Sequence, residues 1–196
     1  MEDYLGIKAV HAPSQKHWRA WLQKNHRKEQ AVWLIIYRKT SSTPSVYYPE
    51  AVDEALCFGW IDSKPNKRDQ ESYYLYFSLR KPKSKWSKVN KIKVEQLLKA
   101  GKIAPAGQAA IDLAKKNGTW YALDKVENLE IPDDFKKKLN ANKSASQFWD
   151  AFPPSAKKGI LQWIESAKRD ETRKKRIEET VKLAALNVRA NQYTPK

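Results

Sequence analysis

The stretch Glu54–Lys93 reads EALCFGWIDSKPNKRDQESYYLYFSLRKPKSKWSKVNKIK and carries most of the signals that decide the fold. Its first residues form an apolar helical pattern that ends at Gly59, because glycine readily adopts the left-handed conformation that closes a helix. Two strands are predicted next, at residues 60–63 and 72–79, since aromatic and β-branched runs favour extended backbone. The turn Arg80–Ser84 then leads into a second helix, so the stretch predicts a fold that mixes helices with a small sheet.

The rest of the chain extends this pattern into an α+β fold. A continuous apolar run predicts a buried strand at about residues 32–38, and Pro49 begins the helix that leads to Gly59. Strand signals stop after residue 122, where only short helical patterns follow. We therefore predict a small, mainly antiparallel three-stranded sheet packed with helices in an α/β core of residues 1–122. An all-helical C-terminal region of four short helices, residues 123–196, is predicted to pack on that core.

Composition limits the classes of protein to which the chain can belong. With 41% hydrophobic and 11% aromatic residues it can bury a core, which argues against disorder over its whole length. A net charge of +16 makes nucleic acid or another polyanion one candidate partner, although solvated lysines on helix surfaces explain the same charge. Neither a signal peptide nor an apolar segment of membrane-spanning length is recognised, so we expect a cytoplasmic protein without membrane insertion.

Sequence motifs for catalysis, cofactors and metals are missing. None of the six glycines belongs to a phosphate-binding loop, and no serine lies in a nucleophile elbow. Cys57 falls in an apolar pattern that predicts a buried, unreactive thiol, and the three histidines have no acidic residues at metal-ligand spacing. We therefore expect no cofactor and no metal, and favour a binding protein over an enzyme that acts at the same pocket.

One constellation of residues is a candidate ligand site. Asp62 and Ser63 end a predicted strand, and seven basic residues with no acidic one lie between Arg80 and Lys93. Cations at a helix N-terminus, here one capped by Ser84, make an anion site, and a tryptophan in the first turn can stack on a planar ligand. The candidate residues for binding a small anionic or planar ligand are Trp60, Asp62, Ser63, Arg80, Lys81, Lys83, Trp86 and Asn90.

The same residues also have a purely structural interpretation. In that case Asp62 pairs with Arg80 or Arg68, both tryptophans belong to the core, and Asn90 bonds to a loop carbonyl. Under the ligand hypothesis Arg80 is exposed, and its replacement by alanine abolishes binding but costs less than ~1 kcal/mol of stability. Binding of nucleic acid or another polyanion through the basic surface is the remaining alternative, which a steep dependence on salt would identify.

Four segments of the chain resemble the YdeI/OmpD-associated family, also called bacteriocin-protection or OmdA-type proteins. They are EALCFGWIDS, RKPKSKWSKVN, GKIAPAGQAAIDLAKKNGTW and WIESAKRDETRKKRIEETVKLA, and the resemblance extends from the WRAWLQKNH segment to Leu186. It implies a link to envelope stress or to tolerance of bacteriocins or cationic peptides, but no catalytic mechanism. The motif residues that carry over, without assigned roles, are Trp60, Asp62, Arg80, Pro82, Trp86 and Asn90.

Overall fold

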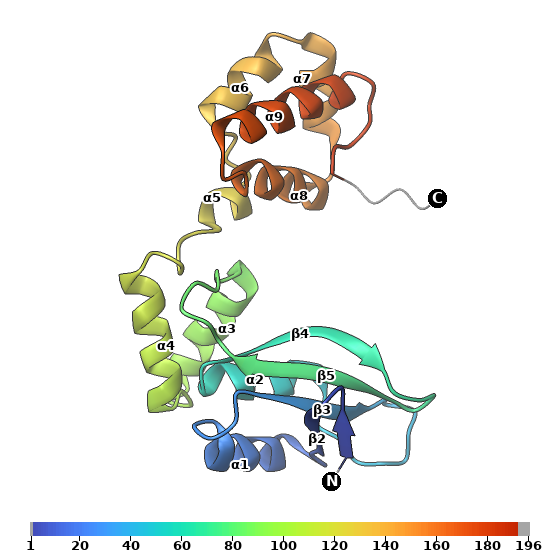
Figure 1. The fold of residues 1–196 in the computed structure, drawn as a ribbon, viewed down its shortest axis with the longest axis vertical. Helices are drawn as coiled ribbons and strands as arrows, with labels where there is room; N and C mark the ends of the chain where they lie inside the picture. The colour runs from blue at the N-terminus through green and yellow to red at the C-terminus, as the bar shows by residue number, and fades with distance from the viewer. Residues whose placement is uncertain (1, 192–196) are drawn as a thin grey trace. The chain divides into compact units, whose positions relative to one another are not determined.

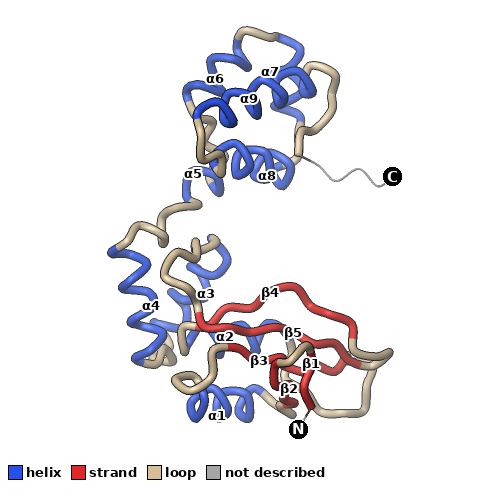
Figure 2. The backbone as a smooth tube through the Cα atoms, in the orientation of Figure 1, coloured by secondary structure: helices blue, strands red, loops and turns tan. Residues whose placement is uncertain are grey.

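The computed structural model describes residues 2–191, and the chain divides into two compact units, Met1–Tyr121 and Ala122–Lys196. One unit is built from a sheet and helices, and the other from helices (Figures 1 and 2). Each unit has its own hydrophobic core. The α+β class predicted from the sequence is confirmed.

The first unit contains a five-stranded mixed sheet in the order β1-β2-β3-β5-β4. β2 and β3 are parallel, whereas the other neighbouring pairs are antiparallel. The strands are β1 (Glu2–Tyr4), β2 (Ile7–His11), β3 (Ala31–Tyr37), β4 (Trp60–Lys67) and β5 (Ser72–Leu79). The predicted strands correspond to β3, β4 and β5, but the prediction of a three-stranded sheet is wrong because it omits β1 and β2.

β1 and β2 are short and carry charged residues, so their sequences give no clear strand signal. Leu5 and Gly6, with φ of 52° and 73°, form the left-handed turn that suits a two-residue hairpin. Tyr4 stacks on Tyr74 of β5 with ring centroids 4.1 Å apart, although β2 and β3 lie between their strands in the sheet order. β1 therefore curls over one face of the sheet, where long-range contacts hold it.

Four helices accompany this sheet: α1 (Gln15–Asn25), α2 (Tyr48–Cys57), α3 (Lys88–Lys99) and α4 (Pro105–Lys116). Alternate residues of β3 join the larger core with Trp18 and Leu22 of α1, while Trp33 and Ile35 face the other side. Trp18 Nε1 donates a hydrogen bond to the carbonyl oxygen of Ala51 at 3.0 Å, which ties α1 to α2. The larger core therefore lies between the helices and one face of the sheet.

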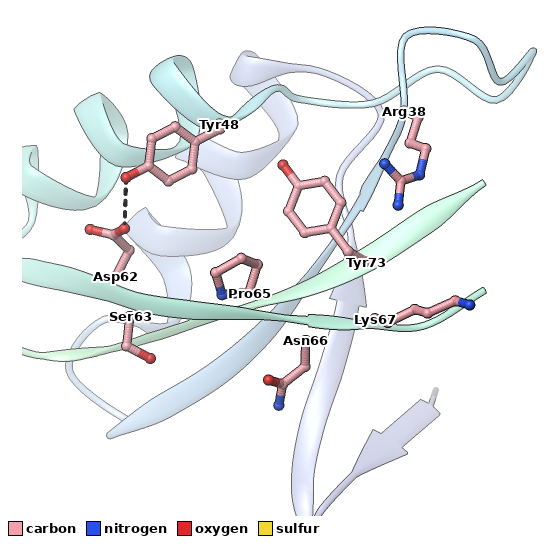
Figure 3. Close-up of a pocket in the computed structure, with 8 residues that line it drawn as sticks. All are labelled: Arg38, Tyr48, Asp62, Ser63, Pro65, Asn66, Lys67 and Tyr73. Atoms are coloured by element: carbon pink, nitrogen blue, oxygen red, sulfur yellow. Dashed lines mark hydrogen bonds between the residues drawn. The ribbon is translucent and has the colours of Figure 1, made fainter. Parts of the chain in front are cut away.

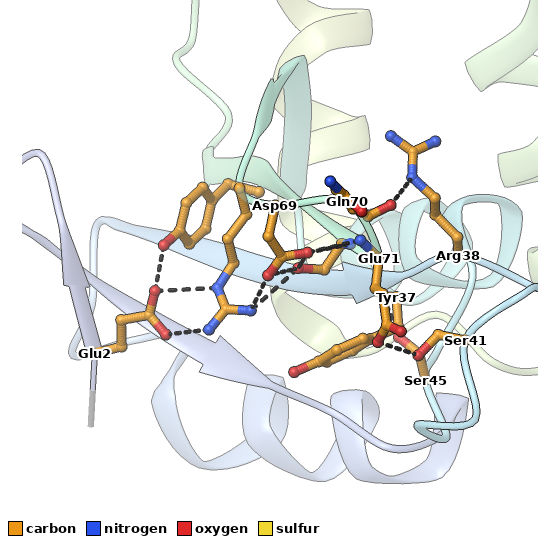
Figure 4. Close-up of polar contacts among 11 residues, drawn as sticks. Glu2, Tyr37, Arg38, Ser41, Ser45, Asp69, Gln70 and Glu71 are labelled. Atoms are coloured by element: carbon orange, nitrogen blue, oxygen red, sulfur yellow. Dashed lines mark hydrogen bonds and ion pairs between the residues drawn. The ribbon is translucent and has the colours of Figure 1, made fainter.

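A polar network fastens β1 to the connection between β4 and β5 (Figure 4). The carboxylate of Glu2 accepts hydrogen bonds from Arg68 Nε at 3.1 Å and Nη2 at 2.9 Å, and another from the hydroxyl of Tyr74. Arg68 also donates to Asp69, whose carboxylate accepts bonds from the backbone and the hydroxyl of Ser72. The hydrogen bond from Arg68 is the largest cause that lowers the pKa of Glu2 below its ordinary value.

The second unit consists of helices over its described residues. They are α5 (Asp124–Glu127), α6 (Asp133–Asn140), α7 (Lys143–Ala151), α8 (Pro154–Glu165) and α9 (Asp170–Ala184). Phe135 and Trp149 meet edge to face in the core with ring centroids 4.9 Å apart, and Ile160 and Ile177 pack in the same cluster. The prediction of four helices is wrong because it omits α5, a single turn too short for a periodic signal.

α4 approaches the end of α2 closely at Gly107. The backbone N–H of Ala104 donates to the carbonyl oxygen of Cys57 at 2.9 Å. A Cβ atom at position 107 would lie 2.8 Å from the carbonyl carbon of Cys57 and would overlap the carbonyl oxygen. Glycine is therefore required at this contact, which fixes α4 beside α2.

We predict that Gly107→Ala destabilises the protein by about 1–3 kcal/mol, because the added methyl group must push two backbones apart. In an exposed helix the same change usually stabilises by about 0.5–1 kcal/mol, so the sign of the effect separates crowding from helix propensity. Urea unfolding monitored by tryptophan fluorescence gives the measurement. Ala109→Gly, at an exposed position of the same helix, is the control; a Gly107→Ala variant as stable as the parent would contradict the close contact.

The Glu2 network predicts a dependence of stability on pH. Because the folded state lowers the pKa of Glu2, its contribution is complete above the unfolded value of 4.5 and is lost as the pH falls through the lower folded value. Glu2→Gln should cost about 0.5–1 kcal/mol near pH 7, since the pair is partly exposed, and progressively less below about pH 4. Urea unfolding at several pH values measures the difference, with Asp3→Asn on the same strand as the control. A cost that stays constant down to about pH 2 would exclude this role of Glu2.

Candidate functional site

The connection between β5 and α3, residues 80–87, holds the most unusual side chain of the first unit. The connection makes a turn at Pro82 and Lys83, closed by the hydrogen bond from the Ser84 backbone N–H to the Lys81 carbonyl oxygen at 2.9 Å. It then continues without helix to Ser87, whose hydroxyl accepts the backbone N–H of Asn90 at 3.2 Å and caps α3. Trp86 lies before the start of α3. Its ring is buried, at 1% exposure, and packs against Trp120 with ring centroids 4.9 Å apart. The predictions that Ser84 caps the helix and that Trp86 lies in its first turn are therefore wrong.

Arg80 is buried and forms no ion pair with any of the residues that the structure describes. Its side chain is 8% exposed, and its guanidinium lies over the ring of Trp86 at 3.7 Å from the centroid. Nη1 donates to the carbonyl oxygen of Lys85 at 3.2 Å, but Nε and Nη2 are buried and have no hydrogen-bond partner among residues 2–191. The expectation of an exposed Arg80 is wrong, because its side chain packs against the aromatic core instead of extending into solvent.

The pKa of Arg80 is lowered, as expected for a buried cation. Burial is the largest cause and lowers the pKa to about 10, while the charge of Asp62 acts in the opposite direction. Asp62 instead accepts a hydrogen bond from the hydroxyl of Tyr48 at 3.0 Å, and Arg68 pairs with Glu2. Within the described part of the chain, neither of the two ion pairs that the structural interpretation assigned to Asp62 forms.

A cavity of about 180 Å³ lies beside Arg80, within the range of space that ordered water or a small ligand occupies. Its lining residues are Arg80, Lys81, Pro82, Trp86, Ala109, Ala110, Leu113 and Ala114. The small side chains of α4 leave this space open. Asn117 Nδ2 donates to the carbonyl oxygen of Pro82 at 2.8 Å and keeps the connection near the end of α4.

The buried polar atoms that lack partners are all donors. Within residues 2–191 they are Trp33 Nε1, Trp60 Nε1, Trp86 Nε1, Arg80 Nε and Arg80 Nη2. Buried donors normally have acceptors, so these groups require an acceptor that the described part of the chain does not supply. Arg80 and Trp86 line the same cavity, which therefore suits a molecule rich in acceptor oxygens.

A second and larger cavity, of about 580 Å³, is lined in part by Asp62 (Figure 3). Its lining residues are Arg38, Tyr48, Asp62, Ser63, Pro65, Asn66, Lys67 and Tyr73, and we call it the groove. Burial, followed by the charge of Asp62, raises the pKa of Tyr48 to about 12. The Tyr48 hydroxyl therefore remains protonated at neutral pH and keeps donating to Asp62.

The structure divides the predicted site residues between these places. Arg80, Lys81 and Trp86 line the Arg80 cavity, whereas Asp62 and Ser63 line the groove. Trp60 is fully buried in the core, Lys83 is exposed on the turn, and Asn90 is half-buried in the first turn of α3.

Several lining residues have no sequence signal that points to a site. Tyr48 and Tyr73 reach the groove through tertiary packing that the sequence does not show. The alanine-rich segment Ala104–Ala110 is the one signal that was available, because small residues permit the close packing seen for α4.

Within residues 2–191, no three histidine, cysteine, aspartate or glutamate side chains gather in a way that could hold a metal ion. None of the helices in the described part of the chain has both the length and the apolar character needed to cross a membrane.

Two family models match the chain, one for each unit. The first is described as a domain of unknown function (DUF8412) and matches residues 10–110, more than half of the chain, so the chain belongs to this family. The second is described as Bacteriocin-protection, YdeI or OmpD-Associated (OmdA) and matches residues 128–187. The suspected YdeI/OmpD-associated family is thus confirmed, with the match in the helical unit. Neither the curated proteins nor the solved structures give a significant match.

The two family matches cover different parts of the chain, and only one of them contains the candidate site residues. All the candidate ligand residues lie between residues 60 and 90, inside the DUF8412 match and outside the OmdA match. The OmdA description therefore assigns no role to Asp62, Arg80 or Trp86.

Proposed function

We propose that the first unit binds a small ligand through a phosphate or carboxylate group that Arg80 receives in its cavity. The observation that carries the proposal is the buried guanidinium, with two nitrogens that lack partners among the described residues. Removing a cation from water is costly unless the cation gains a counter-charge or hydrogen bonds. An oxyanion supplies both, so binding would complete an environment that the fold leaves open.

The surroundings of the cavity favour an anion. Residues 80–93 contain seven basic and no acidic residues. The hydrogen bond from Asn117 to Pro82 brings the end of α4, with Lys115 and Lys116, towards the same connection. Charges of one sign around a cavity with apolar walls raise the local concentration of counter-ions. At about 180 Å³ the cavity is smaller than most ligand pockets, which favours a small anion or the anionic end of a larger molecule.

Entry of the anion requires the connection to move, because Arg80 Nε and Nη2 are closed off from solvent. The backbone N–H of Arg80 donates to the carbonyl oxygen of Gly59 at 3.0 Å, and Trp86 is buried, so the two ends of the connection are held. Besides the bond from Asn117 to Pro82, the backbone N–H of Trp86 donates to the carbonyl oxygen of Thr119 at 3.3 Å. Exposed segments open at lower free-energy cost than the core, so the movement would be confined to the turn between Arg80 and Trp86. The bond from Arg80 Nη1 to Lys85 would be exchanged for bonds to the anion.

Binding of nucleic acid or another polyanion is the second candidate, and the same basic residues favour it. Such binding releases counter-ions from the polyanion and therefore weakens steeply with salt, whereas a single anion in a cavity responds weakly. The two candidates also differ in the residues on which they depend. The exposed lysines, such as Lys83, would dominate polyanion binding, while the cavity depends on the buried Arg80.

The OmdA match supports a proposed physiological context for the chain as a whole, namely protection against bacteriocins. Tolerance of cationic peptides and a response to envelope stress belong to the same proposal. Anion binding by the first unit would then be a separate activity joined to the helical unit in one chain.

We predict that inorganic phosphate stabilises the parent protein and that Arg80→Met removes this stabilisation. At a phosphate concentration ten times the Kd, the gain in the free energy of unfolding is about 1.4 kcal/mol. Without phosphate, Arg80→Met should leave stability unchanged or raise it by about 1–4 kcal/mol, because a buried, unpaired cation is replaced by an apolar side chain of similar length. Urea unfolding with and without phosphate measures both quantities.

Lys83→Met is the matched control, since it removes an exposed charge from the same connection. It should preserve the stabilisation by phosphate. If Arg80→Met destabilises the protein and phosphate has no effect on the parent, then Arg80 has a structural role and the proposal fails. A larger loss in Lys83→Met than in Arg80→Met, together with a steep dependence on salt, would favour the polyanion candidate instead.

A further inference from the structure

The groove has opposite charges at its two ends. Asp62 lies at one end with the hydroxyl of Tyr48, while Arg38 and Lys67 lie at the other end (Figure 3). Between the two ends the groove is lined by Pro65 and the ring of Tyr73. Such a cleft is complementary to a molecule that carries a cation at one end and an anion at the other.

A β-bulge in β4 creates this arrangement. Asp62 pairs with Phe77 and Pro65 with Leu75, so that the strand register shifts between residues 62 and 65. In a regular strand, residues three positions apart point to opposite faces of the sheet. The extra residue of the bulge restores Asp62 and Pro65 to the same face, which is also the face of Lys67 and its partner Tyr73.

Both charged ends retain atoms for binding. Among the hydrogen bonds of the described residues, the Asp62 carboxylate accepts one from Tyr48 on Oδ2, which leaves Oδ1 for a ligand. Arg38 uses Nε to donate to the carbonyl oxygen of Gln70 at 3.1 Å, which leaves its two Nη atoms for a ligand. A carboxylate oxygen is an acceptor for an ammonium group, and the paired Nη donors suit a carboxylate.

We infer that the groove binds a short peptide with both termini free. Its ammonium group would lie against Asp62 and its carboxylate against Arg38, with its middle on Tyr73 and Pro65. The volume of about 580 Å³ lies within the range of small-molecule pockets and accommodates a peptide of a few residues. This inference does not depend on the anion site, because the groove and the Arg80 cavity share no lining residue.

Addition of the peptide as an extra strand is a less suitable mode of binding. β4 is an edge strand, but its bulge interrupts the regular ladder and Pro65 has no backbone N–H to donate. Recognition must therefore come from the side chains in the groove and from the charged termini of the peptide. A peptide with blocked termini should lose most of its affinity.

The test is a titration of the full-length protein with trialanine, N-acetyl-trialanine and trialanine amide, followed by backbone NMR chemical shifts. We expect saturable binding of trialanine with shifts at Asp62 and Tyr73, and at least a tenfold weaker affinity for each blocked peptide. Asp62→Asn should remove the preference for the free amino terminus, and Arg38→Met should remove the preference for the free carboxylate. If each variant loses its preference for one free terminus only, the two residues recognise the peptide termini, and a general change in the shape of the groove is excluded.

Lys64→Met is the matched control, because Lys64 lies in the same strand and does not line the groove. It should leave the affinity for trialanine unchanged, and so should Arg80→Met. The inference is overturned if trialanine gives no saturable shifts up to about 10 mM, a concentration at which only a very weak site would remain undetected. Equal affinity for free and blocked peptides, or a dependence on Arg80 instead of Arg38, would overturn it as well.

Discussion

The stacking of the Arg80 guanidinium on the ring of Trp86 is the contact on which the proposed anion site of the first unit depends. Both side chains are buried, so the connection is held to the core at Arg80 and at Trp86, with an exposed turn at Pro82 and Lys83 between them, and α3 begins after Ser87. The same contact leaves two guanidinium nitrogens without acceptors. Buried donors without acceptors are costly, which is why the proposal assigns Arg80 to ligand binding and not to packing.

The wall of the cavity depends on a second constraint, the close approach of α4 to the end of α2 at Gly107. That approach places the alanines of α4 opposite Arg80, where larger side chains would fill the space. Asp62 lines the groove, and its charge also acts on Arg80. Its charge favours the protonated form of Arg80 from a distance, but its hydrogen bond is with Tyr48. The two proposed sites share no lining residue and differ in chemistry.

Local sequence patterns predicted the parts of the fold that local physics determines. The sequence correctly predicted three such features: the apolar strands β3 and β5, the proline at the start of α4, and the left-handed conformation of Gly59. β1 was missed because its stabilisation comes from Tyr74 and Arg68, far away in the sequence. The basic character of residues 80–93 was visible, but the burial of Arg80 and the bulge after Asp62 were not, since both arise from tertiary packing and strand register.

The side-chain resonance of Arg80 offers the most direct test of the claim that this residue awaits an anion. In the ligand-free protein, the Nε–H group of Arg80 has no acceptor among the described residues, whereas the Nε–H groups of Arg68 and Arg173 already donate to carboxylates. Addition of phosphate should therefore shift the Arg80 Nε–H signal downfield to saturation, because a charge-assisted hydrogen bond forms there, while the other two signals stay in place. An Arg80 signal that phosphate leaves unchanged would contradict the account.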